Sequence, residues 1–518
     1  MVQKVYSGAV YGLECTIVTV EVDISEGLPC MEMVGYLSSE VKEAKERVRV
    51  AMKNAGYHMP VKRITINLAP ANLRKSGNAY DLPMAVGIII AAGVLQWDSE
   101  EQLNALKKQL ERTMVIGELG LAGEIKPVRG ILALVAGAKE QGMDACIVPN
   151  ANVREAALVE DMRVFGADTL KEACGLLGRG LPKENCFQRG EKEQSGEIFY
   201  QNDFSKVQGQ FMARKAAEIA AAGFHNFLMT GPPGAGKTMI AKCIPSILPP
   251  MTKEESLEVS KIYSIAGLLD EEKPLIHNRQ FQNPHHTITK QAFVGGGIIP
   301  RPGIVTLAHR SVLFLDELPE FGRNNLDVLR QPLEDRQVQI TRNGGNIVYP
   351  ANFMLVAAMN PCPCGYFPDR NRCKCTQREI ETYQSRISGP LLDRFDLVVR
   401  VEGIGVEELV KNKKCENSSA IRKRVLAARV KQKNRFMEKG KNVKFNSELN
   451  NEEIEDFCPL KKDGEEFMKQ IYEGQNLSAR GYYRILRVAR TIADLNQEDT
   501  ISKEHLAQAV CLHGEVGR

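Results

Sequence analysis

A glycine-rich loop contains the first residues whose types and spacing could do chemistry. It follows the apolar run Phe227–Thr230, precedes a helical pattern, and reads Gly231-Pro232-Pro233-Gly234-Ala235-Gly236-Lys237-Thr238. A strand, a glycine-rich loop and a helix in this order are the context that a phosphate-binding loop requires. Backbone N–H groups and the helix N-terminus would hold phosphates, Lys237 would reach the β- and γ-phosphates, and Thr238 would ligate Mg²⁺. The loop therefore predicts a site for ATP and Mg²⁺.

Two further apolar runs end in polar side chains. Ser311–Leu315 is followed by Asp316 and Glu317. Asp316 would hold Mg²⁺ through water, and Glu317 would orient and deprotonate the attacking water; an exposed acidic turn is the alternative. Phe353–Ala358 leads to Asn360, which could sense the γ-phosphate and position the water, or be only a turn residue before a proline.

Four cysteines follow closely, as two C-x-C pairs in a loop that also contains glycine and proline. They are Cys362, Cys364, Cys373 and Cys375. Four thiolates could bind a structural Zn²⁺ tetrahedrally, although the usual spacing is C-x-x-C. The alternative is a set of free thiols that are sensitive to oxidation.

The bulk composition indicates a globular protein of two to four domains. The chain has 518 residues, of which 43% are hydrophobic and 25% charged, and its net charge of +4 is too small to indicate nucleic acid by itself. The 13 cysteines occur without a secretory pattern at the start, so we expect a cytoplasmic protein with reduced thiols. The apolar stretch Met84–Leu95 is too short to cross a bilayer, so no membrane association is expected.

Four segments position these residues. Residues 1–175 mix short strand patterns with amphipathic helices, and residues 176–210 are polar and read as a linker. Residues 211–400 alternate strand and helix patterns, which predicts a parallel sheet covered by helices, and residues 401–518 are helical in pattern. The predicted fold class is α/β.

These motifs together resemble the magnesium-chelatase-like AAA+ proteins of the YifB/ComM family, over almost the entire chain. The stretches that carry the resemblance are Gly27–Pro29, Arg63–Pro70, Lys75–Gly77, Asp81–Pro83, Asn283–Ile288, Val294–Gly297, Leu315–Phe321, Met359–Gly365 and Gly389–Asp396. The part that contains the phosphate loop is also similar to magnesium-chelatase motor subunits and replicative MCM helicases. The resemblance implies a Lon-protease-like α+β domain, an AAA+ core and a C-terminal helical lid.

Two arginines receive roles from the resemblance alone. Arg394 would be the arginine finger that reaches the ATP of a neighbouring subunit, and an ion pair on the surface is the alternative. Arg480 falls at the sensor-2 position, with Arg484 and Arg487 on the same helical face as alternatives. A finger acting between subunits implies a ring, which we expect to be a hexamer.

The first domain resembles Lon-type peptidases but lacks their nucleophile and base. The stretch that matches the serine motif places Met84 where the serine would stand, and Leu132 occupies the position of the lysine. Neither side chain can attack a peptide or carry a proton. We therefore expect no peptidase activity, and a role in ring assembly, substrate selection or partner docking.

The expectation of DNA binding comes from two inserts and one basic helix. The glycine run in Ala292–Gly303 and the Asn-Gly pair in Gln337–Tyr349 predict hairpins. In the helicases that the chain resembles, such hairpins point into the central pore and track DNA. Arg342 could meet a phosphate there, or the hairpin could be a plain surface feature. The cationic segment Ala420–Lys444 could contact phosphates or be a solvated helix face.

The resemblance thus implies an ATP-driven DNA motor for branch migration or unwinding in recombination or natural transformation. A metal-chelatase motor, a protein-remodelling ATPase and a scaffold with a vestigial ATPase are the alternatives. The sequence argues against a vestigial ATPase because it retains a complete set of site residues: Lys237, Asp316, Glu317, Asn360 and Arg394.

Overall fold

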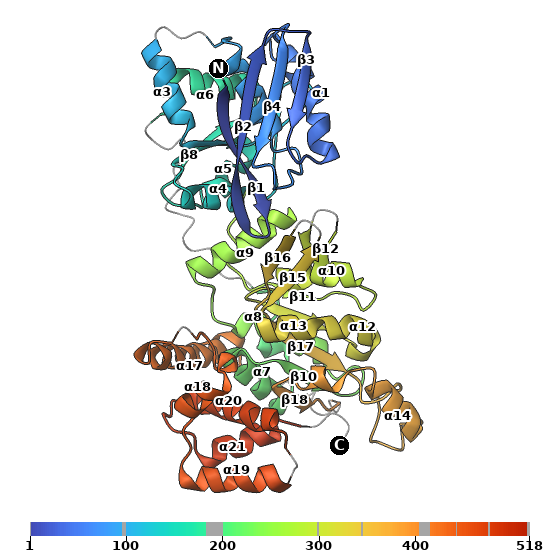
Figure 1. Ribbon diagram of the computed structural model, residues 1–518. Coiled ribbons are helices and arrows are strands. Elements are labelled where there is room, and N and C mark those ends of the chain that lie inside the picture. The colour runs from blue at the N-terminus through green and yellow to red at the C-terminus, as the bar shows by residue number, and fades with distance from the viewer. Residues whose placement is uncertain are drawn as a thin grey trace.

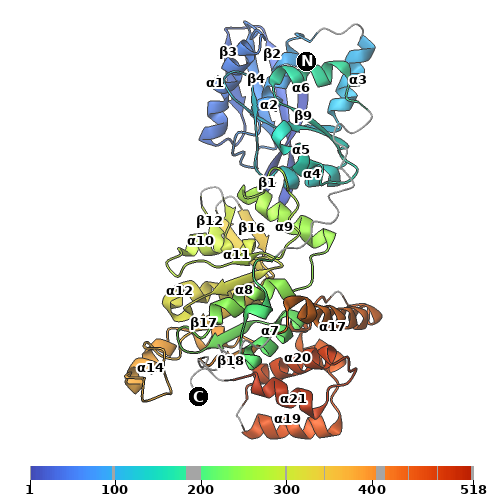
Figure 2. The same ribbon diagram turned by 180° about the vertical axis from the view of Figure 1, so that it is seen from behind.

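The computed structural model describes residues 2–95, 100–182, 200–297, 300–342, 345–403, 415–441, 443–474 and 477–514. Three parts follow one another along the chain and in space: an N-terminal sheet, a central sheet and a C-terminal group of helices (Figure 1). Figure 2 shows the same order from behind. None of the helices in these residues combines the length and the hydropathy that a membrane span needs.

The N-terminal part is built on a mixed seven-stranded sheet in the order β3-β4-β2-β1-β5-β8-β9. Its strands are β1 Gln3–Tyr11, β2 Glu14–Ser25, β3 Cys30–Val34, β4 Arg63–Ala69, β5 Thr113–Val115, β8 Ala145–Pro149 and β9 Arg163–Ala167, with a small hairpin of β6 Glu118–Leu119 and β7 Ile125–Lys126. β2 pairs antiparallel with β1 and β4, and the other pairings in the sheet are parallel.

Helices cover both faces of this sheet. They are α1 Ser39–Asn54, α2 Asp81–Ala91, α3 Glu100–Leu110, α4 Ile131–Glu140, α5 Val153–Ala156 and α6 Leu170–Arg179. Along β8, Ala145 and Ile147 pack in the core with α1, α2 and α6, whereas Cys146 and Val148 pack in a second core with α4. A strand that is apolar on both faces must be covered on both, which explains the layered arrangement.

The central part contains a five-stranded parallel sheet in the order β11-β14-β17-β10-β18. Its strands are β10 Phe227–Thr230, β11 Phe281–Gln282, β14 Val312–Leu315, β17 Met354–Met359 and β18 Leu397–Arg400. Its helices are α7 Phe211–Gly223, α8 Lys237–Ile247, α9 Lys253–Ala266, α10 Lys290–Val294, α11 Ile304–Leu307, α12 Arg323–Leu326, α13 Arg330–Asp335, α14 Gln377–Gln384 and α15 Gly389–Leu392. Because β17 lies between β10 and β14, its carboxyl end lies between the phosphate loop and the acidic pair.

Both predicted hairpins are present as antiparallel pairs. β12 Gly295–Gly296 pairs with β13 Arg301–Pro302, and β15 Gln337–Arg342 pairs with β16 Gly345–Pro350. The two hairpins touch, since the Tyr349 hydroxyl donates to the Pro300 carbonyl over 3.1 Å. The Asn-Gly tip of the second hairpin lies outside the described residues.

The C-terminal part is helical, with α17 Ser418–Glu438, α18 Asn451–Phe457, α19 Lys462–Gly474, α20 Ala479–Leu495 and α21 Lys503–Cys511. Its apolar faces share one core with α7, α8 and the central sheet. The predicted linker, 176–210, overlaps ordered structure at both ends: α6 continues to Arg179, and Phe204 is fully buried in the central core.

The basic helix differs from its prediction in length and in the use of its charges. α17 ends at Glu438, well before Lys444, and Gly440 follows with a φ of 65°. Many of its cations have partners within the chain: Arg422 with the Ser246 carbonyl, Arg424 with Glu218, Arg429 with Gln432, Lys431 with Asp499, and Arg435 with Asp494. The helix therefore does not present a continuous row of unpaired basic side chains to solvent.

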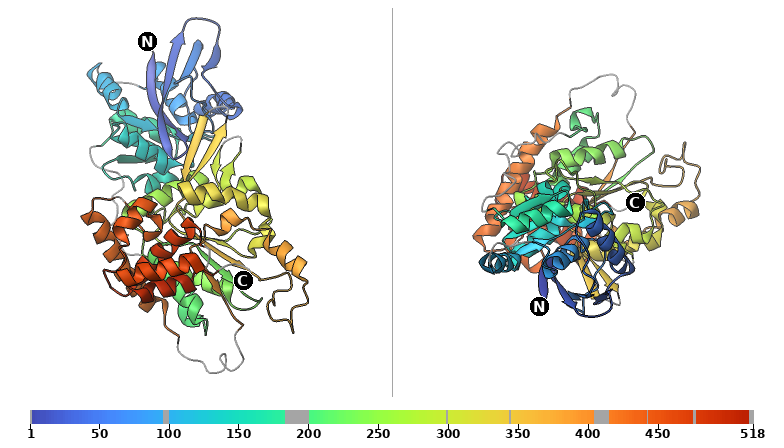
Figure 3. Two further views of the ribbon diagram at one scale, coloured as in Figure 1. Left: turned by 60° about the horizontal axis from the view of Figure 1, so that its bottom comes forward. Right: turned by 90° about the horizontal axis from the view of Figure 1, so that it is seen from above.

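The N-terminal part contacts the central part directly. The Gly130 amide donates to the Ser264 carbonyl over 3.1 Å, and Arg154 donates to the Glu272 carbonyl over 3.3 Å. A Cβ added to Gly12, in the β1–β2 turn, would lie 3.3 Å from Ile347 of β16. Figure 3 shows the yellow hairpin strands reaching the blue N-terminal sheet.

Candidate nucleotide site and cysteine cluster

The phosphate loop joins β10 to α8 and ends in a buried lysine. Gly234 and Gly236 have φ values of 76° and 85°, in the left-handed region that glycine reaches without strain. Lys237 is 8% exposed, and its Nζ donates to Gly231 O at 2.7 Å, Pro232 O at 2.8 Å and Asn360 Oδ1 at 3.1 Å. Burial lowers the pKa of Lys237, although the nearby acidic pair partly offsets this effect. The ammonium group thus lies between the loop and the end of β17.

The acidic pair faces the start of α8. Thr238 Oγ1 donates to Asp316 Oδ2 over 2.7 Å. Glu317 is exposed, adopts a left-handed φ of 51°, and its amide donates to Asp316 Oδ1 over 3.0 Å. A hydroxyl and a carboxylate at this distance are oxygen ligands of the kind that Mg²⁺ prefers.

These groups line one cavity of about 350 Å³. Its lining consists of Pro233, Gly234, Ala235, Gly236, Lys237, Thr238, Asp316, Glu317, Met359 and Asn360. The structure therefore brings together most of the residues that the sequence predicts for nucleotide binding and hydrolysis. Gly231 and Pro232 contribute through the carbonyls that accept from Lys237.

Arg394 and Arg480 lie elsewhere. Arg394 follows α15, forms an ion pair with Glu334, and has a side chain that is 13% exposed. Arg480 is exposed on the first turn of α20. Within the described part of the chain, neither side chain lines the nucleotide cavity.

Of the two alternatives to Arg480, Arg484 is already bonded to residues beside Arg394. It is buried, donates to the Phe395 carbonyl over 2.9 Å and pairs with Asp393 at 3.7 Å, on either side of Arg394. Arg484 therefore connects α20 to the segment that carries the predicted finger. Arg487 is partly buried, and burial lowers its pKa.

A second connection between these elements has no signal in the sequence. His225, before β10, hydrogen-bonds through Nε2 to Thr491 Oγ1 of α20 at 2.8 Å and through Nδ1 to Asp396 Oδ2 at 3.3 Å. Burial alone would raise the pKa of Asp396, but the bond with His225 and nearby arginines lower it. Only Asp396 could have been noticed beforehand, because it belongs to the motif around Arg394.

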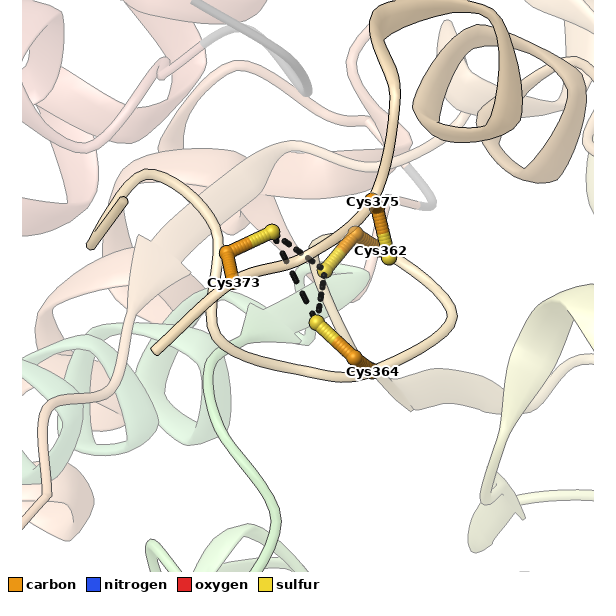
Figure 4. A group of neighbouring side chains, drawn as sticks. All are labelled: Cys362, Cys364, Cys373 and Cys375. Carbon is orange, nitrogen blue, oxygen red and sulfur yellow. Dashed lines mark hydrogen bonds between the residues drawn. The ribbon is translucent and has the colours of Figure 1, made fainter. Parts of the chain in front are cut away.

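The four predicted cysteines converge in the loop that follows Asn360 (Figure 4). Cys362 Sγ lies 3.3 Å from Cys364 Sγ and 3.7 Å from Cys373 Sγ, and the last two sulfurs are 3.5 Å apart. All four sulfurs, including that of Cys375, lie within 4.8 Å of one another. A hydrogen bond from the Tyr366 amide lowers the pKa of the Cys364 thiol. The group has the composition and spacing of a tetrathiolate metal site.

The two positions that replace a Lon-type dyad are core residues. Met84 in α2 and Leu132 in α4 are both fully buried. Asp81, just before Met84, is also buried and pairs with Arg47 at 2.9 Å. A nucleophile and a base are thus replaced by apolar packing at these positions.

Models of magnesium-chelatase families match three successive segments. "Subunit ChlI of Mg-chelatase" matches residues 20–152, "Magnesium chelatase, subunit ChlI" matches 203–409, and the ChlI C-terminal family matches 415–513. The family that matches residues 203–409 has an ATPase domain, which implies ATP hydrolysis with Mg²⁺.

Similarity to individual proteins extends over the whole chain. The uncharacterized protein YifB of Escherichia coli K12 is 41% identical over 510 residues, covering 98% of this chain and 96% of YifB. Competence protein ComM of Haemophilus influenzae is 40% identical over 512 residues, with the same two coverages. More distant partial matches are Lon protease 2 of Bacillus subtilis, at 27% over 230 residues, and an MCM-type protein of Methanocaldococcus jannaschii, at 30% over 112 residues. The chain belongs to the YifB/ComM family of magnesium-chelatase ChlI-like AAA ATPases.

Proposed function

We propose that this ATPase is a motor that acts on DNA, working as a hexameric ring in the cytoplasm during recombination or natural transformation. The observation that carries the ATPase half is the convergence of Lys237, Thr238, Asp316, Glu317 and Asn360 on one cavity. The DNA half is supported by full-length similarity to a competence protein and by the two hairpins that pack together on the central part. No disulfide joins the cysteines of the described residues, which fits a reducing compartment.

The proposed roles follow from the positions of the side chains. Lys237 binds the β- and γ-phosphates, while Thr238 and Asp316 hold Mg²⁺, which offsets the phosphate charge when bound. Glu317 accepts a proton as the water oxygen bonds to the γ-phosphorus and the bond to the β–γ bridging oxygen breaks, leaving ADP and phosphate. Asn360, already held by Lys237, orients that water.

The site needs a cation from a second subunit. Lys237 is the cation in the lining of the cavity, and Arg394 and Arg480 belong to other surfaces of the described chain. We assign Arg394 as the arginine finger that reaches the ATP of a neighbouring subunit. We assign Arg480 as the sensor-2 arginine of the lid. This assignment requires a closed ring of subunits.

The hairpins are the proposed contacts with DNA. In β15–β16 the side chains of Val338, Ile340, Ile347 and Tyr349 are buried, which fixes the hairpin on the core. The opposite face exposes Gln339, Thr341, Asn346 and Val348. The polar side chains of this face suit sequence-independent contact with a DNA backbone, and Arg342 is the proposed contact with a phosphate.

We further propose the division 1–175 for an inactive Lon-like domain, 176–210 for a linker, 211–400 for the AAA+ core and 401–518 for the lid. The Lon-like domain rests on α9 and on the β15–β16 hairpin, so it can sense or limit hairpin movement. This arrangement supports a role in ring assembly or substrate selection rather than in proteolysis.

The decisive measurement is the ATPase rate with and without single-stranded, duplex and four-way-junction DNA. DNA should stimulate hydrolysis, Glu317→Gln should abolish it, and Arg342→Ala should reduce the stimulation. Arg49→Ala, an exposed arginine of α1, is the matched control and should leave the stimulation unchanged. An ATPase that is indifferent to every DNA would exclude the DNA motor and direct attention to a chelatase-type or protein-remodelling client.

A further inference from the structure

The cysteine loop has only a small apolar core. Residues 361–376 contain no helix or strand, and the buried apolar cluster there consists of Cys362, Cys373 and Ile380, with Tyr366 and Phe367 partly buried against it. So small an apolar cluster does not offset the conformational entropy of ordering a loop of this length. Another source of order is therefore needed at the cysteines themselves.

The positions of the sulfurs select a single metal ion over a cluster or disulfides. Zinc–sulfur bonds of about 2.3 Å in a tetrahedron put neighbouring sulfurs about 3.8 Å apart. The three sulfur–sulfur separations of 3.3, 3.7 and 3.5 Å lie just below that distance, and they are far from a covalent S–S bond of about 2.05 Å. An iron–sulfur cluster would hold the cysteines of different iron atoms farther apart than 4.8 Å, whereas all four sulfurs here lie within that distance.

The same loop lies directly against the phosphate loop. Gly365, which closes the Cys362–Gly365 turn, is buried and has a φ of 86°. A Cβ at this position would lie 2.5 Å from Pro233 Cδ, so the two backbones are in close contact. Pro233 itself lines the nucleotide cavity.

The start of the cysteine loop is also tied to the site. Cys362 comes two residues after Asn360, whose side chain accepts from Lys237. The Gly231 amide donates to the Met359 carbonyl over 3.2 Å, and Gln384 of α14 donates to the Pro361 carbonyl over 3.0 Å. Movement of the Cys362–Gly365 turn would therefore displace both Pro233 and Asn360.

We propose that Cys362, Cys364, Cys373 and Cys375 bind one Zn²⁺, and that this ion holds the phosphate loop in its nucleotide-binding conformation through the contact of Gly365 with Pro233. The zinc touches no nucleotide and takes no part in hydrolysis. The second half of the proposal rests on the nucleotide site described above, whereas the first half is independent of it.

Metal analysis of the full-length protein, purified with a thiol reductant and zinc, tests the first half. Wild type should contain about one zinc per chain, and Cys373→Ser close to none. The controls Cys30→Ser and Cys511→Ser, at exposed cysteines outside the cluster, should keep the zinc. If Cys373→Ser fails to fold, wild type stripped with a chelator should take up one zinc again and protect four thiols from alkylation. A wild type that neither contains nor takes up zinc, or that contains iron instead, overturns the proposal.

Binding of a fluorescent ATP analogue, without DNA, tests the second half. Stripping the zinc should weaken binding by about fivefold or more, and restoring it should reverse the loss. Gly365→Ala should weaken binding while keeping the zinc, because the new methyl group pushes against Pro233. Gly142→Ala is the matched control, with a φ of 87° and open space around it. Unchanged affinity in both the stripped protein and Gly365→Ala overturns the coupling, whatever the response of the ATPase to DNA.

Discussion

Thr238 Oγ1 donates a hydrogen bond to Asp316 Oδ2 across 2.7 Å, although 78 positions separate the two residues in the chain. The bond joins the first turn of α8 to the end of β14. It aligns two oxygen atoms that are suited to one Mg²⁺, so the site is organised by the apoprotein itself.

Thr238→Ala should therefore lower Mg²⁺-dependent ATP hydrolysis about 100-fold, because the hydroxyl that positions the ion is lost. Thr238→Ser keeps the hydroxyl and should retain most of the rate. The measurement is the ATPase rate as a function of Mg²⁺ concentration. Equal rates for Thr238→Ala and Thr238→Ser would show that the hydroxyl has no part in the reaction.

Glu317→Gln should separate binding from hydrolysis. The side chain is exposed at the cavity and forms none of the contacts of Lys237, so ATP should still bind, while loss of the base should slow hydrolysis about 100-fold or more. Glu320→Gln, three residues on and paired with Arg386, is the control and should keep the rate. Loss of ATP binding in Glu317→Gln would contradict the assigned role.

The proximity of the nucleotide-site residues could be predicted because it follows from one rule. Parallel strands carry their carboxyl ends at the same edge, so Lys237, Asp316 and Asn360 meet once their strands are recognised. The short spacing of the four cysteines likewise predicts their cluster. Hydrophobic periodicity and short motifs were sufficient to predict the nucleotide site and the cysteine cluster. Each of them depends on local sequence or on neighbouring strands of one sheet.

Features that depend on long-range partners could not be predicted. Nothing in the sequence indicates that His225 meets Thr491, or that Gly365 presses on Pro233. For the basic helix the sequence predicts either a phosphate-contacting face or a solvated face, because its acidic partners, such as Glu218 and Asp494, belong to distant segments. Charge counted along the chain does not reveal charge neutralised in the fold.

Subunit mixing should reveal whether Arg394 acts on a neighbour. Arg394→Ala alone should lower hydrolysis about a thousandfold, since an arginine finger stabilises the charge of the transition state. Mixing this variant with Glu317→Gln should restore part of the rate, because some interfaces then combine an intact Glu317 with an intact Arg394. Glu334→Gln, which removes only the ion-pair partner within the chain, is the control. A mixture as inactive as its two components would place the arginine's action within its own subunit.

Acid should destabilise the contact between the C-terminal helices and β18, where His513, just after α21, forms a bridge with Val398. Burial, with the nearby Arg484, lowers the pKa of His513 to about 4 from its ordinary 6.5, so the folded state prefers the neutral ring. The resulting stability is complete above pH 6.5 and is lost as the pH falls toward 4, because the unfolded chain then binds the proton more tightly. Thermal unfolding of wild type and His513→Gln should differ least near pH 4 and most above pH 6.5. The predicted change in that difference is on the order of 2 kcal/mol. A difference that is constant with pH would contradict the prediction.

Arg490→Ala should lower the stability of the C-terminal helices. Arg490 is fully buried in α20, pairs with Asp494 at 3.0 Å, and donates to the carbonyls of Glu498 and Asp499. Its removal leaves the buried carboxylate of Asp494 with one cationic partner, Arg435, and a hydrogen bond from Asn446, and breaking a buried pair typically costs about 3–5 kcal/mol. Hydrogen exchange should rise in α20 and α21 but not in the N-terminal sheet. Arg49→Ala breaks an exposed pair with Glu46 and should cost less than about 1 kcal/mol. Equal protection of α20 in Arg490→Ala and wild type would mean that the buried pair contributes no stability to these helices.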